Sequence, residues 1–298
     1  MTRVLVTGAR GFVGRYLVES LEKAGTAVTG WGRQEVDLLD RGAVASGIAG
    51  LRPDVVYHCA GAAHVGQAFN NIADTLAANV LGTHHVLDAL RRAGVRARVL
   101  ITGSSLVYRQ SDRALNEGDP IGPATPYAVS KLAQEMLGQR GISEDGQDVL
   151  LARPFNHTGP RQDPTYAAPT FARQIALIER GQLRPEIIVG NLDASRDLHD
   201  VRDTVRAYTL IVERGESGRI YNVCSGHSFR IREVLDRLVA LSRVPVTVTV
   251  DPARYRPSDN MVVWGDRGRI ERELGWRPVI SLDQTLADLL DYWRKEIE

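Results

Sequence analysis

Tyr127 and Lys131 are four positions apart in a segment that begins at Pro126 and predicts a helix, so both side chains share one helical face. A nearby lysine ammonium favours the phenolate and lowers a tyrosine pKa from about 10. Such a tyrosine can give a proton to a carbonyl oxygen or take one from an alcohol. Upstream, a hydroxyl of Ser104 or Ser105 could hydrogen-bond the substrate oxygen as that oxygen gains charge. The pattern predicts carbonyl or alcohol chemistry with Ser104, Tyr127 and Lys131 as catalytic residues.

A glycine run at the N-terminus predicts a cofactor site. Glycines at positions 8, 11 and 14 follow a short apolar segment and open a helical pattern. Glycine permits a tight turn and the close approach of a pyrophosphate, and the helix N-terminus offers free N–H groups and a positive partial charge. A plain tight turn is the alternative, but the strand–loop–helix context favours a dinucleotide. The residues expected to contact it are Gly8, Arg10, Gly11, Phe12 and Val13.

The end of the second predicted strand bears on which dinucleotide is bound. An NAD site usually has a carboxylate there for the ribose 2′-hydroxyl, whereas an arginine suits a 2′-phosphate. The segment reads Thr-Gly-Trp-Gly-Arg over 29–33, and the first carboxylate is that of Glu35. Arg33, together with Arg10, therefore favours NADP(H), while NAD(H) stays possible. Arg33 could also be a solvated loop residue.

Further cofactor contacts are expected after the second and third strands. Asp37 and Leu38 could border the adenine. Small residues after the third strand would let the cofactor lie against the backbone, although a simple helix-entry loop would look the same. These small residues are Ala60, Gly61 and Ala62. Lys131, beside Tyr127, could also hold the nicotinamide ribose.

The elements that must position these residues alternate between strand and helix. Short apolar, non-alternating strands are predicted at 4–6, 27–29, 54–58, 98–102 and 148–152. Helical patterns lie between them at 12–24, 41–51, 70–93 and 126–139. This order predicts an α/β fold with a Rossmann-type, doubly wound parallel sheet.

The alternation weakens after Arg153, where proline and glycine become frequent. Helical patterns continue at 170–180, 201–214, 231–241 and 282–295. We therefore expect a dinucleotide-binding domain over 1–153 and a smaller, interleaved substrate lobe over 154–298, some of whose segments return to the sheet.

Composition narrows the class of protein. The 298 residues include 37 Lys and Arg against 36 Asp and Glu, so a net charge of +1 offers no global attraction to nucleic acid or membrane. Apolar runs all fall short of the ~18 residues that span a bilayer. The two cysteines, Cys59 and Cys224, have no metal-ligand spacing and are expected to be buried thiols. We expect a cytoplasmic protein without a bound metal.

Taken together, the glycine run, the serine pair and the Tyr-x-x-x-Lys motif resemble the extended short-chain dehydrogenase/reductase family over essentially the whole chain. The resemblance implies hydride transfer at a sugar carbon, a nucleotide diphosphate in the C-terminal lobe, and a homodimer. Residues 153–160, Arg-Pro-Phe-Asn-His-Thr-Gly-Pro, look like a segment of the GDP-mannose 4,6-dehydratases and of the reductases that act on their product. The substrate-binding residues that the resemblance implies are Ser104, Ser105, Asn156, Asn191, Arg196 and Arg256.

One departure from the dehydratase pattern is informative. Those enzymes have a glutamate two positions after the catalytic Thr, and counting from Ser104 this position is Leu106, which cannot accept a proton. Ser105 takes the place of Ser104 if the alignment of this segment with the family pattern shifts by one residue. The resemblance thus implies reduction of the 4-keto group of a GDP-linked 6-deoxy sugar. A nucleotide-sugar 4-epimerase with bound NAD and a non-catalytic NADP-sensing protein are the alternatives.

Overall fold

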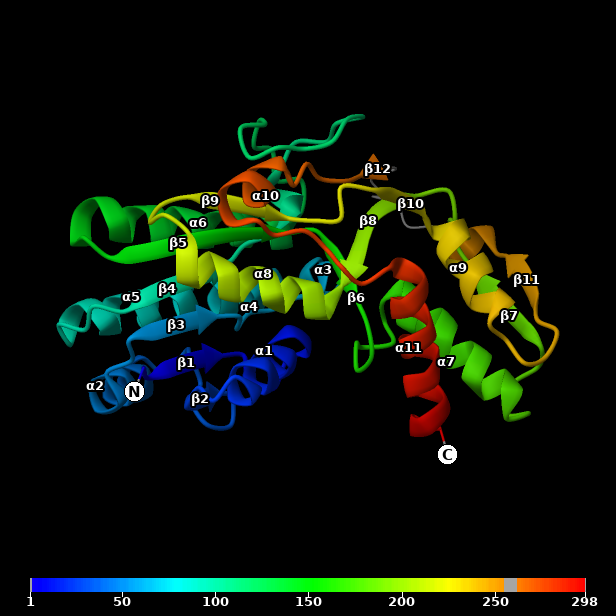
Figure 1. Ribbon diagram of the computed structural model, residues 1–298, viewed down its shortest axis with the longest axis horizontal. Helices are drawn as coiled ribbons and strands as arrows, with labels where there is room; N and C mark the ends of the chain where they lie inside the picture. Colours follow the sequence, from blue (N-terminus) through cyan, green and yellow to red (C-terminus); the bar gives the residue numbers. More distant parts are fainter. Residues whose placement is uncertain (1, 255–261, 298) are drawn as a thin grey trace.

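A parallel sheet of six strands, in the order β2-β1-β3-β4-β5-β9, forms the larger part of the protein (Figure 1). The computed structural model describes residues 2–254 and 262–297. The strands are β1 (Val4–Thr7), β2 (Val28–Trp31), β3 (Val55–His58), β4 (Arg98–Thr102), β5 (Asp148–Pro154) and β9 (Ile220–Val223). The predicted Rossmann-type α/β fold is confirmed, and β9 is a segment of the C-terminal half that returns to the sheet.

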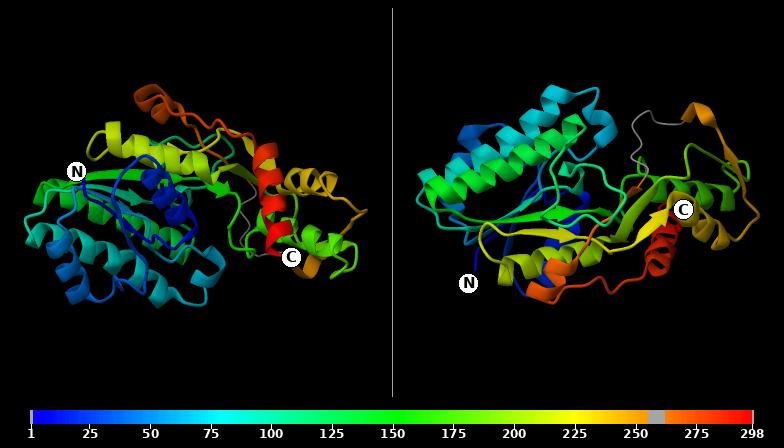
Figure 2. Two further views of the ribbon diagram at one scale, coloured as in Figure 1. Left: turned by 60° about the horizontal axis from the view of Figure 1, so that its bottom comes forward. Right: turned by 90° about the horizontal axis from the view of Figure 1, so that it is seen from above.

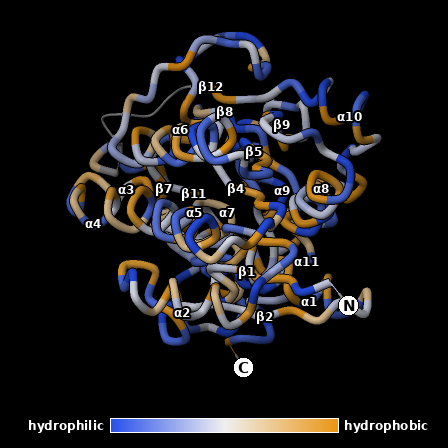
Figure 3. Tube along the Cα trace, turned by 90° about the vertical axis from the view of Figure 1, so that its left-hand side faces the viewer, coloured by the Kyte–Doolittle hydropathy of each residue, from blue (hydrophilic) through white to orange (hydrophobic). Residues whose placement is uncertain are grey.

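Helices cover both faces of this sheet, as Figure 3 shows for α2 and α6 on one side and α1 and α8 on the other. The first group, α2 (Arg41–Leu51), α5 (Gly82–Arg92) and α6 (Pro126–Asp145), packs on a core that includes Leu5. The second group, α1 (Phe12–Lys23), α8 (Val201–Arg214) and α10 (Gly268–Leu274), packs on Val4 and Val6. Because successive strand residues face opposite sides, coverage of both faces requires continuous apolar strands.

The smaller lobe lies at one end of the sheet in all views (Figures 1 and 2). Its core joins α7 (Ala167–Glu179), α9 (Ile231–Ala240) and α11 (Leu282–Glu296) with the parallel pair β7 (Glu186–Val189) and β11 (Thr247–Val250). Four short strands connect the lobe to the sheet: β8 pairs with β6, β10 and β12. They are β6 (Asn156–Thr158), β8 (Ser195–Asp200), β10 (Ser228–Arg230) and β12 (Val262–Val263).

The long helix predicted over 70–93 is interrupted. After α3 (Val65–Ala68), the chain forms α4 (Ile72–Leu76), a π-helical turn η1 (Ala77–Leu81) and then α5. Conversely, α6 continues six residues beyond its predicted end at 139, to Asp145, and stops at Gly146, whose φ of 63° makes a left-handed C-cap. Short 3₁₀ turns occur at η2 (Ser105–Val107) and η3 (Pro252–Arg254). Within the described ranges, every helix is too short or too polar to cross a bilayer.

Candidate active site

The loop between β1 and α1 is closely packed against the neighbouring strand end. Gly8 has a φ of +70°, and a Cβ there would lie 2.7 Å from the amide nitrogen of Ala60. A Cβ on Gly14 would lie 2.1 Å from the carbonyl oxygen of Gly8. A side chain fits at neither position. Glycine therefore keeps the N-terminus of α1 close to the loop, which is the geometry a pyrophosphate cradle requires.

A pocket of about 510 Å³ opens beside this loop. Its walls come from the carboxyl ends of β1, β2 and β3 and from α4 and η1. Seven of the predicted cofactor-binding residues line it: Gly8, Arg33, Asp37, Leu38, Ala60, Gly61 and Ala62. The other residues predicted from the glycine run, Arg10, Gly11, Phe12 and Val13, lie in the loop and the first turn of α1. These residues fit an elongated dinucleotide, with its adenosine half in the pocket.

Two ion pairs border the end of β2. The Arg10 guanidinium donates hydrogen bonds to the Glu35 carboxylate, with Nε 2.8 Å from Oε1. Arg33 Nε lies 3.5 Å from the Asp37 carboxylate. Both arginines expected at a 2′-phosphate therefore have acidic partners, and sequence reasoning assigned no role to Glu35.

The three predicted catalytic side chains are buried together where β4 ends and α6 begins. Ser104 is the N-cap of η2, and its Oγ accepts from the N–H of Leu106 at 3.2 Å. Burial raises the pKa of the Tyr127 phenol above its usual value, and the Ser104 hydroxyl acts on that pKa in the opposite direction. Lys131 Nζ lies 5.9 Å from the centre of the Tyr127 ring. This arrangement keeps the phenol protonated and places a cation next to it.

Lys131 is held by polar groups rather than by a carboxylate. Its ammonium donates to the carbonyl oxygen of Thr102 and to Gln134 Oε1, both at 2.8 Å. Burial lowers the pKa of Lys131 to about 8, and electrostatic interactions with Cys59 and Glu135 act in the opposite direction. Ser105, the alternative to Ser104, is also buried but lies inside η2.

Asn79 is a site residue that sequence reasoning missed. It lies in η1 and is fully buried. Its Oδ1 accepts from the N–H of Ala62 at 2.7 Å, and its Nδ2 donates to Ser130 Oγ at 2.8 Å. Asn79 thereby ties the small-residue loop of the cofactor pocket to the helix that carries Tyr127 and Lys131. An asparagine in an apolar helical run was the available signal, and π-helical turns often mark functional sites.

A second pocket, of about 410 Å³, lies in the smaller lobe and along β6 and β8, which connect the lobe to the sheet. It is lined by Asn156, Asn191 and Arg196, so three of the predicted substrate-binding residues, 40 positions apart at the extremes, come together. Arg256 lies outside the described residues. Arg153, the first residue of the 153–160 segment, is instead buried in an ion pair with Glu135 at 2.8 Å. This ion pair links β5 to α6.

Tyr166 connects the two pockets and was not predicted. It lines the lobe pocket, and its hydroxyl donates to the carbonyl oxygen of Ala63, a residue of the cofactor pocket, at 3.2 Å. Its charge when ionised would raise the pKa of Tyr127, which indicates that the two phenols are neighbours. Tyr127 itself lines neither of these two pockets, but it lies beside Tyr166, which contacts both.

Two glutamates close to the catalytic group in sequence, Glu117 and Glu135, are engaged in other interactions. Glu117 accepts a hydrogen bond from the N–H of Asn222 at 2.8 Å and pairs with Arg269 at 3.6 Å. Glu135 is occupied by Arg153. The dehydratase position is occupied by Leu106, and both of these glutamates are held by other partners.

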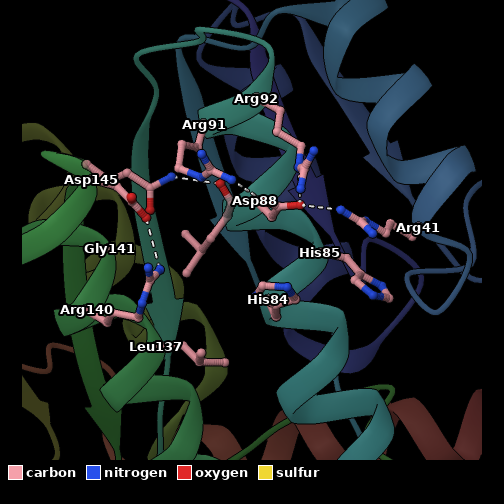
Figure 4. A pocket seen from close by; sticks show the side chains of 12 residues that line it. Arg41, His84, His85, Asp88, Arg91, Arg92, Leu137, Arg140, Gly141 and Asp145 are labelled. Carbon is pink, nitrogen blue, oxygen red and sulfur yellow. Dashed lines mark hydrogen bonds and ion pairs between the residues drawn. The ribbon is translucent and has the colours of Figure 1, made fainter.

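A third pocket lies apart from this site, between α5 and α6 (Figure 4). Three arginines, Arg41, Arg91 and Arg92, converge on Asp88, while Arg140 pairs with Asp145. The residues that line it line neither of the other two pockets. Because its arginines are neutralised by carboxylates, we do not include it in the candidate active site.

Comparisons with known proteins agree with this geometry. Residues 4–224 match the model of the NAD dependent epimerase/dehydratase family. GDP-6-deoxy-D-mannose reductase of Pseudomonas aeruginosa is 39% identical, over 99% of this chain and 98% of that protein. Among solved structures, RMD from Pseudomonas aeruginosa complexed with NADPH superimposes with a TM-score of 0.91 at 37% identity, over 99% of this chain and 100% of that one.

A more distant neighbour represents the epimerases. The UDP-glucose 4-epimerase of Thermus thermophilus in complex with NAD gives a TM-score of 0.87 at 27% identity, over 98% of this chain and 99% of that one. The glycine loop, the Ser104–Tyr127–Lys131 group and these similarities lead to one conclusion. The chain belongs to the NAD dependent epimerase/dehydratase family, whose model covers it from β1 to β9 and Cys224.

Proposed function

We propose that this protein reduces the 4-keto group of GDP-4-keto-6-deoxy-D-mannose with NADPH and forms GDP-D-rhamnose in the cytoplasm. The observation that carries the proposal is the buried Ser104–Tyr127–Lys131 group, whose Tyr127 neighbours Tyr166, the residue that joins the lobe pocket to the cofactor pocket. The similarity to GDP-6-deoxy-D-mannose reductase supports this choice of sugar, and the NADPH in its structural neighbour supports the choice of cofactor.

The roles of the residues follow from their positions. When bound, the dinucleotide supplies the hydride for the carbonyl carbon. The Ser104 hydroxyl, which is near Tyr127, orients the ketone oxygen. Tyr127 donates its phenolic proton to that oxygen, a role suited to a phenol whose pKa is raised by burial. The Lys131 ammonium stabilises the phenolate that results and can return a proton to it.

Binding of the substrate is assigned to the lobe pocket. Asn156 and Arg196 would hydrogen-bond the diphosphate, for which a guanidinium is well shaped, and Asn191 would lie towards the nucleoside. Arg256 is proposed as a second phosphate ligand by its sequence motif alone. We propose that residues 1–153 mainly bind the dinucleotide and that residues 154–298 mainly bind the sugar nucleotide.

Leu106 argues against dehydratase activity. Elimination of water needs a base close to the sugar, and Glu117 and Glu135 are held in other interactions. The protein would then act on a sugar that has already been dehydrated. Incubation with GDP-mannose and NADP should leave GDP-mannose unchanged, and formation of the 4-keto sugar would contradict this part of the proposal.

The nucleotide preference can be measured without the keto sugar. Thermal unfolding with NADPH present should shift upwards with GDP and not with UDP, CDP or dTDP, since a ligand that binds only the native state raises its stability. A shift with UDP or dTDP alone would instead favour the 4-epimerase, which the similarity to the Thermus enzyme supports. An epimerase would also carry NAD through purification, which absorbance and mass spectrometry of the released cofactor detect.

We propose a homodimer built on α4, η1 and α6. Large apolar side chains are exposed on these elements: Ile72 at 48%, Leu81 at 49%, Val129 at 46% and Met136 at 60%. Exposed apolar side chains on elements that pack together, as α4 and η1 do with α6, are typical of an interface between subunits. The groove of Figure 4 lies between α5 and α6, and one of its lining residues, Leu137, follows Met136 in α6.

A further inference from the structure

Glu35 is a carboxylate beside the cofactor pocket that the reaction itself does not use. It lies in the turn after β2, where its Oε2 accepts from the N–H of Gly32 at 2.9 Å. Its Oε1 accepts from Arg10 Nε at 2.8 Å. These bonds, the one to Arg10 above all, lower the pKa of Glu35 to about 2. The carboxylate is therefore ionised throughout the physiological range.

Gly32 lies between the cofactor pocket, which it lines, and the Arg10–Glu35 pair, which does not line the pocket. Gly32 lines the pocket, and a Cβ there would lie 2.7 Å from Glu35 Oε2 and 2.9 Å from Arg10 Cδ. The pair is thus in contact with a pocket wall that has no side chain. The N–H of Ala9 donates to the carbonyl oxygen of Trp31 at 3.2 Å, which holds the Arg10 loop against the end of β2.

The charges at this position cancel. Arg10 pairs with Glu35, and Arg33 lies 3.5 Å from Asp37. A 2′-phosphate, with a charge of about −2, must share Arg10 with Glu35 or displace Glu35 from it. It also lies near the negative charge of Glu35. A 2′-hydroxyl meets neither obstacle, because it is neutral and can donate to a carboxylate.

We infer that Glu35, by holding Arg10, weakens the binding of a 2′-phosphorylated dinucleotide, so that the site accepts NADH as well as NADPH. Glu35 is then a residue that sets cofactor choice rather than a catalytic residue. This inference rests on the proposed dinucleotide site, and it concerns affinity rather than turnover.

The test is calorimetric titration of NADPH and of NADH into the purified protein without sugar. The wild type should bind the two with Kd values within about tenfold of each other. Glu35→Gln keeps an acceptor for the Gly32 N–H but removes the charge. It should tighten NADPH about tenfold, the effect of one like-charge repulsion near a protein surface, and leave NADH unchanged or weaker.

Asp40→Asn is the matched control. Asp40 lies in the same connection and caps α2 by accepting from Ala43 N–H at 2.9 Å, a role that asparagine also fills. It removes the same charge, so equal tightening of NADPH by this variant would overturn the specific role of Glu35. Equal effects of Glu35→Gln on NADPH and NADH would overturn it as well.

A double variant separates competition for Arg10 from simple repulsion. In the Arg10→Gln background, NADPH should bind more weakly than to the wild type, and Glu35→Gln should then tighten it by clearly less than in the wild type. An undiminished effect would contradict competition. Binding of neither dinucleotide to the wild type would overturn the dinucleotide site itself, a failure distinguishable from a wrong role for Glu35.

Discussion

Single residues of this protein owe their chemical properties to burial. The motif that contains Tyr127 and Lys131 can be recognised in the sequence, whereas their pKa values depend on the folded structure. Burial raises the pKa of Tyr127 and lowers that of Lys131. The phenol becomes harder to ionise and the ammonium easier to deprotonate. In a reductase both shifts have a use, because the tyrosine must start protonated and the lysine must return a proton.

The pH dependence of the rate follows from Lys131. Its pKa is lowered to about 8 by burial, so above pH 8 the ammonium that stabilises the phenolate is progressively lost. We predict that kcat/KM for the keto sugar, at saturating NADPH, falls as pH rises through about 8. Steady-state rates over the alkaline range test this. A rate that stays constant up to pH 10 would assign the proton transfer to another group.

The same shift has a consequence for folding. The Lys131 pKa is about 8 in the folded state and near its ordinary value of 10.5 when the chain is unfolded. The unfolded chain therefore binds more protons between these values, so this group's contribution to stability rises with pH across that window. The penalty, fully present below pH 8, is about 3 kcal/mol by the linkage relation.

At the scale of elements, η1 shows how a local irregularity positions a functional side chain. The π-helical turn over Ala77–Leu81 directs Asn79 to the Ala62 backbone and to Ser130, which joins the cofactor loop to α6. A regular helix through this segment would turn the side chain elsewhere. The irregularity thus belongs to the site and not only to the fold.

We predict that Asn79→Ala lowers both stability and activity. Loss of its buried hydrogen bonds should reduce the free energy of unfolding by about 1–3 kcal/mol. The loosened loop and α6 should lower kcat more than they raise KM for the sugar. Asn70→Ala, at an exposed asparagine before α4, is the control and should match the wild type in chemical denaturation and kinetics. Wild-type kcat in Asn79→Ala would refute the positioning role.

The elements could be predicted from the sequence where burial follows a simple pattern. Strands β1, β3, β4 and β5 are apolar because helices cover both faces, and α1, α2 and α8 follow the helical period. The short strands of the lobe could not be predicted from the sequence in this way. β8 reads Ser-Arg-Asp-Leu-His-Asp, and its buried Asp197 is satisfied by the N–H groups of Ser225 and Gly226, which are distant in sequence.

The candidate site divides in the same way. Gly8, Ala60 and Gly61 were predictable because parallel strands bring their carboxyl ends to one edge, and Ser104 follows the next strand. Asn79, Tyr166 and Glu35 were not assigned, because their roles depend on contacts with other loops. Neither periodicity nor a short motif encodes such contacts.

At the scale of the whole molecule, one tyrosine, Tyr166, connects two pockets. The cofactor pocket lies at the carboxyl ends of the strands, and the lobe pocket lies among β6, β8, α7 and α9. Tyr166 bridges them at a hydrogen bond of 3.2 Å. In the proposed function, this arrangement would bring the dinucleotide and the sugar nucleotide together by their reactive ends, with the rest of each held by a different lobe.

The proposed dimer makes a prediction at this scale. Met136→Glu places a charge at the most exposed of the four apolar side chains assigned to the interface and should convert a dimer into a monomer, as measured by light scattering at micromolar concentration. Val279→Glu, at an equally apolar and exposed position before α11, should leave the dimer intact. A monomeric wild type, or a dimer unaffected by Met136→Glu, would contradict this interface.

The measurement that tests the central claim most directly is the reaction of the purified protein with NADPH and GDP-4-keto-6-deoxy-D-mannose. Loss of NADPH absorbance and the NMR spectrum of the product should show one NADPH oxidised per sugar and GDP-D-rhamnose formed. Tyr127→Phe should slow this by about 10²–10⁴-fold, the usual contribution of general acid catalysis. An unchanged keto sugar, with a UDP-hexose converted to its 4-epimer without net cofactor consumption, would contradict the account.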